Sequence, residues 1–570
     1  MRGVRLVACV CAALCGGRAA GQDVLHVRAG AGSAGDGSSW AKAFPELVPA
    51  LAAAQDGDQI WVAQGAYTPA AGGLDQDATF LLPDGVAVYG GFLGNELTLA
   101  QRDPASHLVV LSGDLLGDDA LGEDHWVDNS HSLLLASGTS AGTLLDGFVI
   151  RGGHGDPFGS LQPGGLRVQG GSITVRACAF VQNSGPTGAL SCGQAGSTVV
   201  DACMFVDNRG GFGPGAIKAN HDHVLDLRNS AFLGNTGYDF GGALQLMSAT
   251  TTIYGCLFSG NRTSLATGGG GAIHALHGSV KVVNSTFTGN VSLANGSSGG
   301  ALAEQDCIVT FRNSVLWGDA AQVASMGQQE IDATGGSVQL LQCLVEGWAG
   351  QFLGGGNLDL DPLFVDAPGP DGVAGTMDDD CRLQPGSPAI DSANNSAVPA
   401  DSQDADHDHI LLESCPLDLR LVGRFEDDPD TPDLPSQTAP VVDRGAFEFS
   451  RWNNLGHALG GATTPYLVGF GSWTPGLELG VRITGTRPLS FGFLFVSTAA
   501  LDAHFKGGVM VPFPSLGFGL TTDATGSLTA PSLMPPGTPS QVALYLQAWF
   551  VDVSGPYGFS ATNAVSGVVK

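Results

Sequence analysis

Five copies of the string Phe-x-x-Asn constrain the fold of this chain more than any other feature of its sequence. They read FVQN, FVDN, FLGN, FSGN and FTGN, and successive phenylalanines are 25 to 29 residues apart. The phenylalanines are Phe180, Phe205, Phe232, Phe258 and Phe287. Each period also carries a second unit, in the order TGAL, PGAI, GGAL, GGAI and GGAL. Such a short unit cannot enclose a core, so neighbouring units must bury one another's apolar faces by stacking.

The residues before each phenylalanine fall into columns that alternate as they do in a strand. An apolar column, expected to face inward, is Val175, Val200, Leu227, Ile253, Val282, Phe311 and Leu340. The next column is mostly polar, so we expect it to face solvent and to pair opposite charges between strands. It consists of Arg176, Asp201, Arg228, Tyr254, Val283 and Arg312.

A bend follows these two columns. Small residues and asparagines tolerate the left-handed backbone of such a bend. They are Ala177, Ala202, Asn229, Gly255, Asn284 and Asn313. After the bend, one inward slot holds a small cysteine or serine in every period. Its members are Cys178, Cys203, Ser230, Cys256, Ser285, Ser314 and Cys343.

This pattern predicts an all-β fold, a right-handed parallel β-helix with three sides and a rise of about 4.8 Å per coil. We expect the β-helix to span residues 22–450, with an irregular Asp- and Pro-rich end from about residue 358. An amphipathic helix at about residues 44–54 is expected to close the first coil, because an open end exposes strand edges. Alternating runs separated by turns predict a small antiparallel β-sandwich at residues 451–570.

The charge and the termini narrow the class of protein. A formal net charge of -30 disfavours nucleic acid and anionic membranes as partners, because both need basic patches. Residues 1–21 have the basic, apolar and small-residue parts of a signal peptide, so we expect a secreted or cell-surface protein. No later stretch is long and apolar enough to span a bilayer. We expect a monomer, and in an exported protein Cys381 and Cys415 are the pair expected to form a disulfide.

At this point the motifs resemble known families. The paired GGA(I/L) and Phe-x-x-Asn motifs resemble repeats of the polymorphic outer membrane protein family, which are bacterial surface-displayed β-helices. The strings "DGDQIWVAQGAYTP" and "VYGGFLGNE" resemble the first coils of the pectate-lyase-like superfamily. The region from "DPLFVDAPG" to "VVDRGAFEF" is similar to the end of the β-helix in planctomycete surface proteins. The resemblance implies the fold but no single activity, since this architecture hosts lyases, hydrolases and adhesins.

One polar column offers candidate chemistry. Three residues beyond each Gly-Ala start stand Arg167, Ser191, Lys218, Gln245, His274 and Ala303. Lys218 and His274, two coils and roughly 10 Å apart, are the candidate catalytic residues of a groove. Arg167, Gln245, Asn220, His221 and His277 are the candidate ligand-binding residues. The alternative is a solvated polar face with turns rich in His and Asp.

Aspartates near the end of the predicted β-helix form a candidate calcium site. They alternate with glycines in flexible loops, and calcium prefers six to eight oxygen ligands. The candidates are Asp366, Asp371, Asp378, Asp380, Asp404, Asp406 and Asp408. The alternative is that they form turns and add solubilising charge.

Two functions are consistent with these features. The first is a non-catalytic, exported surface or extracellular protein that binds a polysaccharide or another cell-surface component along its coils, with a C-terminal domain for attachment or sorting. The second is a lyase or glycoside hydrolase that acts on an acidic glycan in the groove around Lys218 and His274.

Overall fold

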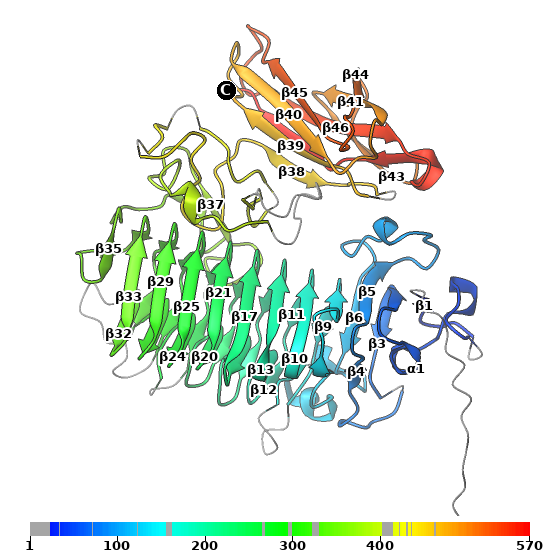
Figure 1. Cartoon of the computed structure of the whole chain (residues 1–570), viewed down its shortest axis with the longest axis vertical. Coiled ribbons are helices and arrows are strands. Elements are labelled where there is room, and N and C mark those ends of the chain that lie inside the picture. Colours follow the sequence, from blue (N-terminus) through cyan, green and yellow to red (C-terminus); the bar gives the residue numbers. More distant parts are fainter. Residues whose placement is uncertain are drawn as a thin grey trace, which may run out of the picture.

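The computed structural model describes residues 23–570 with internal gaps. The gaps are 33–34, 71, 122, 156–161, 265–267, 294–298, 322–329, 402–413, 416, 421, 429–430, 435 and 461–462. The described chain is almost entirely β-structure, with a long parallel solenoid followed by antiparallel sheets (Figure 1). None of its helices combines the length and apolar composition needed to cross a bilayer.

Six successive coils, from β10 (Leu166–Arg176) to β31 (Ala320–Ala321), contribute strands to three parallel sheets. In one coil, β16 (Ile217–Asn220) and β17 (His223–Arg228) belong to the largest sheet, β18 (Ala231–Leu233) to a ten-stranded sheet, and β19 (Thr236–Gly237) to a six-stranded sheet. The chain then begins the next coil with β20 (Leu244–Met247). The predicted three-sided parallel coil is therefore confirmed.

The repeated phenylalanines form a continuous stack inside the solenoid. Successive ring centroids are 4.7, 4.9, 4.6 and 4.6 Å apart from Phe180 to Phe287, and the ring planes are tilted by 6° or less. All five rings are fully buried. A spacing this close to the distance between strands keeps every ring in contact with both neighbours.

The other predicted inward columns are also confirmed. Both the aliphatic column that begins at Val175 and the Cys/Ser slot that begins at Cys178 are buried along the solenoid. At the bend between them the backbone is left-handed, with φ between 41° and 62°. Arg176 pairs with Asp146, its register partner on the preceding coil, at 2.6 Å. This contact is the expected pairing of opposite charges on adjacent strands.

The asparagines of the repeat form a second buried ladder. The carboxamide of Asn183 donates to Asn208 at 3.1 Å, and the same bond repeats through Asn235 and Asn261 to Asn290 at 2.9 to 3.0 Å. Asn290 donates in turn to Asp319 at 2.8 Å. Asn208, Asn235 and Asn261 also donate to the phenylalanine carbonyl of the preceding coil, so each of these turns is held by the coils on both sides of it.

Part of the column expected to face solvent is covered. Tyr254 and Val283 are only 2 % and 1 % exposed, because they pack against Ala393, Val398 and Val442. These partners belong to residues 380–449, a mostly irregular segment that we call the strap. It lies along the solenoid and separates the solenoid from the C-terminal sheets (Figure 1). The expectation that this face is open to solvent is therefore wrong here. The apolar residues of the strap are buried against it, and they cover Tyr254 and Val283 in turn.

The predicted disulfide is also wrong. Cys381 and Cys415 are both free and buried. Cys381 packs with Leu257 and Phe447, whereas Cys415 lies in the separate apolar cluster around Tyr254. The two thiols lie in separate apolar clusters, and each acts as a small apolar filler.

The two ends of the chain have simpler structures. Helix α1 (Leu47–Ala53) buries Leu47, Ala50 and Leu51 in the solenoid core, and β2 (Gln59–Ala63) follows it. After the strap, the C-terminal strands from β38 (Asn453–Gly456) to β48 (Ala564–Val568) pair antiparallel. The larger sheets of this region share one core around Trp473 and Phe550.

Candidate functional site

The predicted polar column is a true ladder in the structure. Register pairs connect Arg167 to Ser191, Ser191 to Lys218, Lys218 to Gln245, and Gln245 to His274. The order and spacing of Lys218, Gln245 and His274 are therefore those expected from the repeat.

Burial limits what this ladder can do chemically. His274 is 7 % exposed and Gln245 4 % exposed, and the ring of Phe240 lies 4.9 Å from the His274 imidazole. Burial lowers the pKa of His274 to about 4, so the imidazole is neutral at pH 7. Burial also lowers the pKa of Lys218. Asp332, the carboxylate in register with Ala303, is two coils beyond His274, too far to pair with it.

The remaining candidate ligand residues lie in turns. Asn220 ends β16, and His221 follows it with a left-handed backbone at φ 55°. His277 follows β24 (Ile273–Leu276) and faces Asp306, with 3.7 Å between the imidazole and the carboxylate. These residues border the strands that carry Lys218 and His274 but do not form one cavity with them. Their role in ligand binding stays a prediction.

Three of the predicted calcium residues make turn or ion-pair contacts. Asp380 pairs with Arg382 at 2.5 Å, and Asp371 accepts a hydrogen bond from the backbone of Val373 at 2.8 Å. Asp366 is exposed in β36 (Phe364–Asp366), and Asp378 contacts Thr376. Asp404, Asp406 and Asp408 lie outside the described residues. Within the described part of the chain, other carboxylates come closer together, namely Asp114 with Asp118 and Asp128, and Asp391 with Asp427 and Asp433.

A different location gathers groups suited to ligand binding. A cavity of about 300 Å³ lies beneath the loop 113–133, which connects β6 (Val109–Ser112) to β7 (Leu134–Thr139). This loop contributes Asp119 and Trp126. The solenoid contributes one residue from each of three successive coils, and these residues are Arg151, Gln182 and Arg209.

The polar groups of this cavity are held by their neighbours. The amide of Asn129 donates to both carboxylate oxygens of Asp119 at 3.1 Å. Burial, together with the nearby Asp114 and Asp128 charges, raises the pKa of Asp119 to about 6 against the opposing effects of Asn129 and Arg151. The Arg209 guanidinium lies 5.8 Å from the centre of the Trp126 ring. The cavity therefore combines an indole, two guanidinium groups and one carboxyl that titrates near neutral pH.

Little in the sequence indicates this site. Its indole and its carboxyl come from a loop outside the repeat, in the string "GDDALGEDHWVDNSH". The one available signal was a tryptophan among acidic and polar residues in a long connection between two coils, since such loops commonly carry function.

A second, apolar cavity of about 470 Å³ lies among the C-terminal sheets. Its lining includes Trp452, Leu494, Phe518, Leu533 and Leu546. Phe518 and Leu533 are more than half exposed, so the cavity opens on an apolar surface.

Comparisons with known proteins agree with the fold. A family model described as "Right handed beta helix region" matches residues 138–316, so this part of the solenoid is a right-handed β-helix. No curated protein matches the chain.

Solved structures with some likeness to the chain include two lyases. One is titled "Rhamnogalacturonan lyase", with 12% identity and a TM-score of 0.36, and the match covers 64% of this chain and 97% of that one. Another is titled "Crystal structure of pectate lyase Pel9A", with 16% identity, a TM-score of 0.35, and coverage of 76% and 97%. At these values the likeness says nothing about activity.

Proposed function

We propose that this chain is an exported surface or extracellular β-helix protein that binds an acidic glycan, without cleaving it, in the cavity beneath Trp126. The observation that carries the proposal is the convergence of Trp126, Arg151 and Arg209 on one cavity on the outside of the solenoid. The chain as a whole is strongly acidic, so a cavity with two guanidinium groups differs from the rest of the protein. These positive charges make the cavity suited to an anionic ligand.

Each lining group matches one part of a uronic-acid sugar. The apolar face of a pyranose ring packs on an indole, and a uronate carboxylate accepts paired hydrogen bonds from a guanidinium group. Gln182 adds an amide that can bond hydroxyl groups. Of the described residues that line the cavity, Asp119 is the single carboxyl group. Glycoside hydrolysis usually needs two carboxyl groups across the bond, so this arrangement favours binding over cleavage.

Titration calorimetry with acidic and neutral oligosaccharides tests the proposal. We expect oligouronates to bind the wild-type protein, and we expect Trp126→Ala and Arg209→Ala each to weaken binding roughly 30-fold, or about 2 kcal/mol. Phe212→Ala is the matched control, because Phe212 is an exposed aromatic residue on the same solenoid and outside the cavity. Equal affinity of the Trp126, Arg209 and Phe212 variants would contradict the proposed site.

The remaining architecture fits an exported binding protein. We propose that residues 1–21 are the signal peptide, that residues 22–450 form the β-helix, with α1 closing its first coil, and that residues 451–570 form a β-sandwich that attaches the protein. The open apolar cavity of this C-terminal region supports the attachment role, because surfaces of this kind contact partners. The repeats are, in this proposal, those of bacterial surface β-helix proteins.

The second candidate function is a polysaccharide lyase or hydrolase acting at Lys218 and His274. The in-register ladder favours it, as does the lowered pKa of Lys218, which brings that amine closer to acting as a base. Incubation with acidic polysaccharides in the presence of calcium, followed by ultraviolet detection of unsaturated products, tests it. Activity lost on Lys218→Ala would replace the binding proposal, and no product from either protein would exclude lyase activity on those polysaccharides.

A further inference from the structure

Two loops of the strap bring three carboxylates together. Asp391 follows the buried segment around Ile390, and Asp427 and Asp433 lie on a later loop. One carboxylate oxygen from each of the three lies within 4.8 Å of the other two. Asp391 is fully buried, Asp433 is half-buried and Asp427 is exposed, so the group extends from the interior of the strap to solvent.

Asp391 lacks the partners that a buried carboxylate normally has. Its Oδ2 atom accepts a hydrogen bond from the backbone of Asp428 at 3.3 Å, and its Oδ1 atom has no hydrogen-bond partner among the described residues. The guanidinium of Arg451 pairs with Asp428 at 3.3 Å. An isolated buried charge of this kind is costly unless a cation compensates it.

We propose that Asp391, Asp427 and Asp433 bind a calcium ion that holds the two strap loops together. Oxygens bound to one calcium at roughly 2.4 Å lie at most about 4.8 Å apart, so the observed separation fits a shared ion. The donors are all carboxylate oxygens, which suit a hard cation and not the softer metals bound by cysteine or histidine. The opening on the side of Asp427 gives the ion a route in and leaves room for water ligands.

The backbone around the site is already fixed. Asp391 donates its N–H to Asp443 at 2.7 Å and accepts from the N–H of Leu434 at 2.9 Å, which joins the two loops. Ligands held in this way lose little freedom when an ion binds, which favours affinity.

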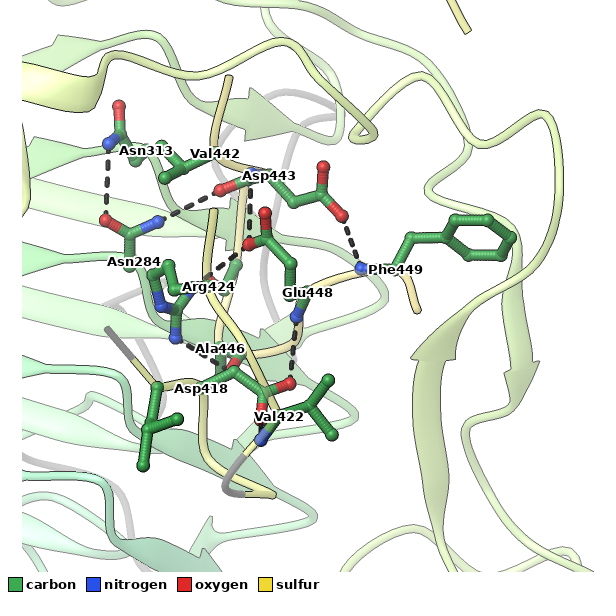
Figure 2. Close-up of polar contacts among 12 residues, drawn as sticks. Asn284, Asn313, Asp418, Val422, Arg424, Val442, Asp443, Ala446, Glu448 and Phe449 are labelled. Carbon is green, nitrogen blue, oxygen red and sulfur yellow. Dashed lines mark hydrogen bonds and ion pairs between the residues drawn. The ribbon is translucent and has the colours of Figure 1, made fainter. Parts of the chain in front are cut away.

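The same contacts connect the site to the solenoid. Asp443 belongs to a buried network in which Arg424 faces Glu448, and Asp418 accepts from the backbone of Glu448 (Figure 2). The Asn284 side chain, at a bend of the solenoid, donates to the Asp443 carbonyl at 2.9 Å. An ion at Asp391 would therefore stabilise the strap where it meets the coils and where the chain continues to the C-terminal sheets.

The other close group of carboxylates carries no such inference. The carboxylate of Asp114 already accepts three backbone N–H groups, from Gly117, Asp118 and Asp119. Its geometry is explained by the turn that these bonds close.

Calcium titration of the chelator-treated full chain tests the proposal. We expect the wild-type protein to bind calcium with a Kd on the order of 0.1 mM, and we expect Asp427→Asn/Asp433→Asn to lose one equivalent of binding. Saturating calcium should raise the wild-type unfolding midpoint by roughly 5 °C and leave that of the double variant unchanged. Asp502→Asn is the matched control, since Asp502 is an exposed acidic residue outside the group. Equal calcium binding by the double variant and the wild-type protein would overturn the site.

A second variant separates an ion site from a purely structural carboxylate. Asp391→Asn removes the buried charge while keeping the shape of the side chain. If Asp391 binds an ion, this change raises the unfolding midpoint in chelator and abolishes the rise produced by calcium. A lowered midpoint in chelator with an intact calcium response would refute the proposal.

Discussion

The asparagine ladder gives the sharpest test of how the coils are held together. Asn235 is fully buried and makes four hydrogen bonds. Its Oδ1 atom accepts from the backbone N–H and the carboxamide of Asn208 at 3.1 and 2.9 Å. Its Nδ2 atom donates to the Phe205 carbonyl at 2.8 Å and to Asn261 at 3.0 Å. Asn235→Ala therefore leaves the backbone N–H of Asn208, one carboxamide hydrogen of Asn208 and the Phe205 carbonyl without this partner inside the solenoid, whereas Asn261 Oδ1 still accepts from the backbone N–H of residue 235 at 3.1 Å.

The expected loss is large because these groups stay buried. An unsatisfied buried polar group costs about 1–3 kcal/mol, and at the lower limit three of them reduce the free energy of unfolding by roughly 3 kcal/mol. Denaturant unfolding followed by circular dichroism measures this change in the solenoid. The matched control is Asn95→Ala, since Asn95 is exposed and its loss should cost less than about 0.5 kcal/mol. A loss below about 1 kcal/mol for Asn235→Ala would show that water replaces the ladder at little cost, and would refute the reasoning.

Three further predictions rest on buried or perturbed groups. Phe232→Ala removes a ring stacked on both sides and should lower the free energy of unfolding by about 3–5 kcal/mol, whereas Phe212→Ala, at a ring 56% exposed, should have little effect in the same assay. Burial raises the pKa of Asp319 to about 7, so the folded protein keeps a proton that the unfolded chain loses above its ordinary pKa of 3.8. The free energy of unfolding should therefore fall between about pH 4 and pH 7, and Asp319→Asn should reduce that slope in denaturant titrations; an unchanged slope would contradict this assignment. The pKa of Asp119 is about 6, so lowering the pH through 6 removes a negative charge from the cavity and should raise its affinity for oligouronates. Calorimetry should find no such rise in Asp119→Asn.

The solenoid could be predicted because its contacts repeat in the sequence. Each phenylalanine touches the same residue type one period away, so the periodicity of Phe205 and Phe232 already contains the contact between them. The strap could not be predicted in this way, since Tyr254 packs against Val442, which belongs to no repeat. The only signal was that Tyr254 and Val283 are less polar than the rest of their column.

The candidate site shows the same contrast. The register of Lys218 with Gln245 follows from the repeat and was predicted, but the burial of His274 depends on Phe240, a residue of the connecting segment. The cavity beneath Trp126 depends on how a loop without periodicity folds over Arg151 and Arg209. Sequence reasoning therefore located the scaffold and missed the groups that connecting loops bring to it.

The hydrogen bonds of the asparagine ladder all run in one direction along the solenoid. Every carboxamide donates towards the C-terminal neighbour, and the series ends on Asp319, whose Oδ1 atom accepts the last of these bonds. A domain built this way is modular: a whole coil with its own asparagine could be inserted or deleted at any interior position and leave the terminal acceptor intact. Evolution could thus lengthen or shorten the rod in single-coil steps, changing its reach without redesigning either end.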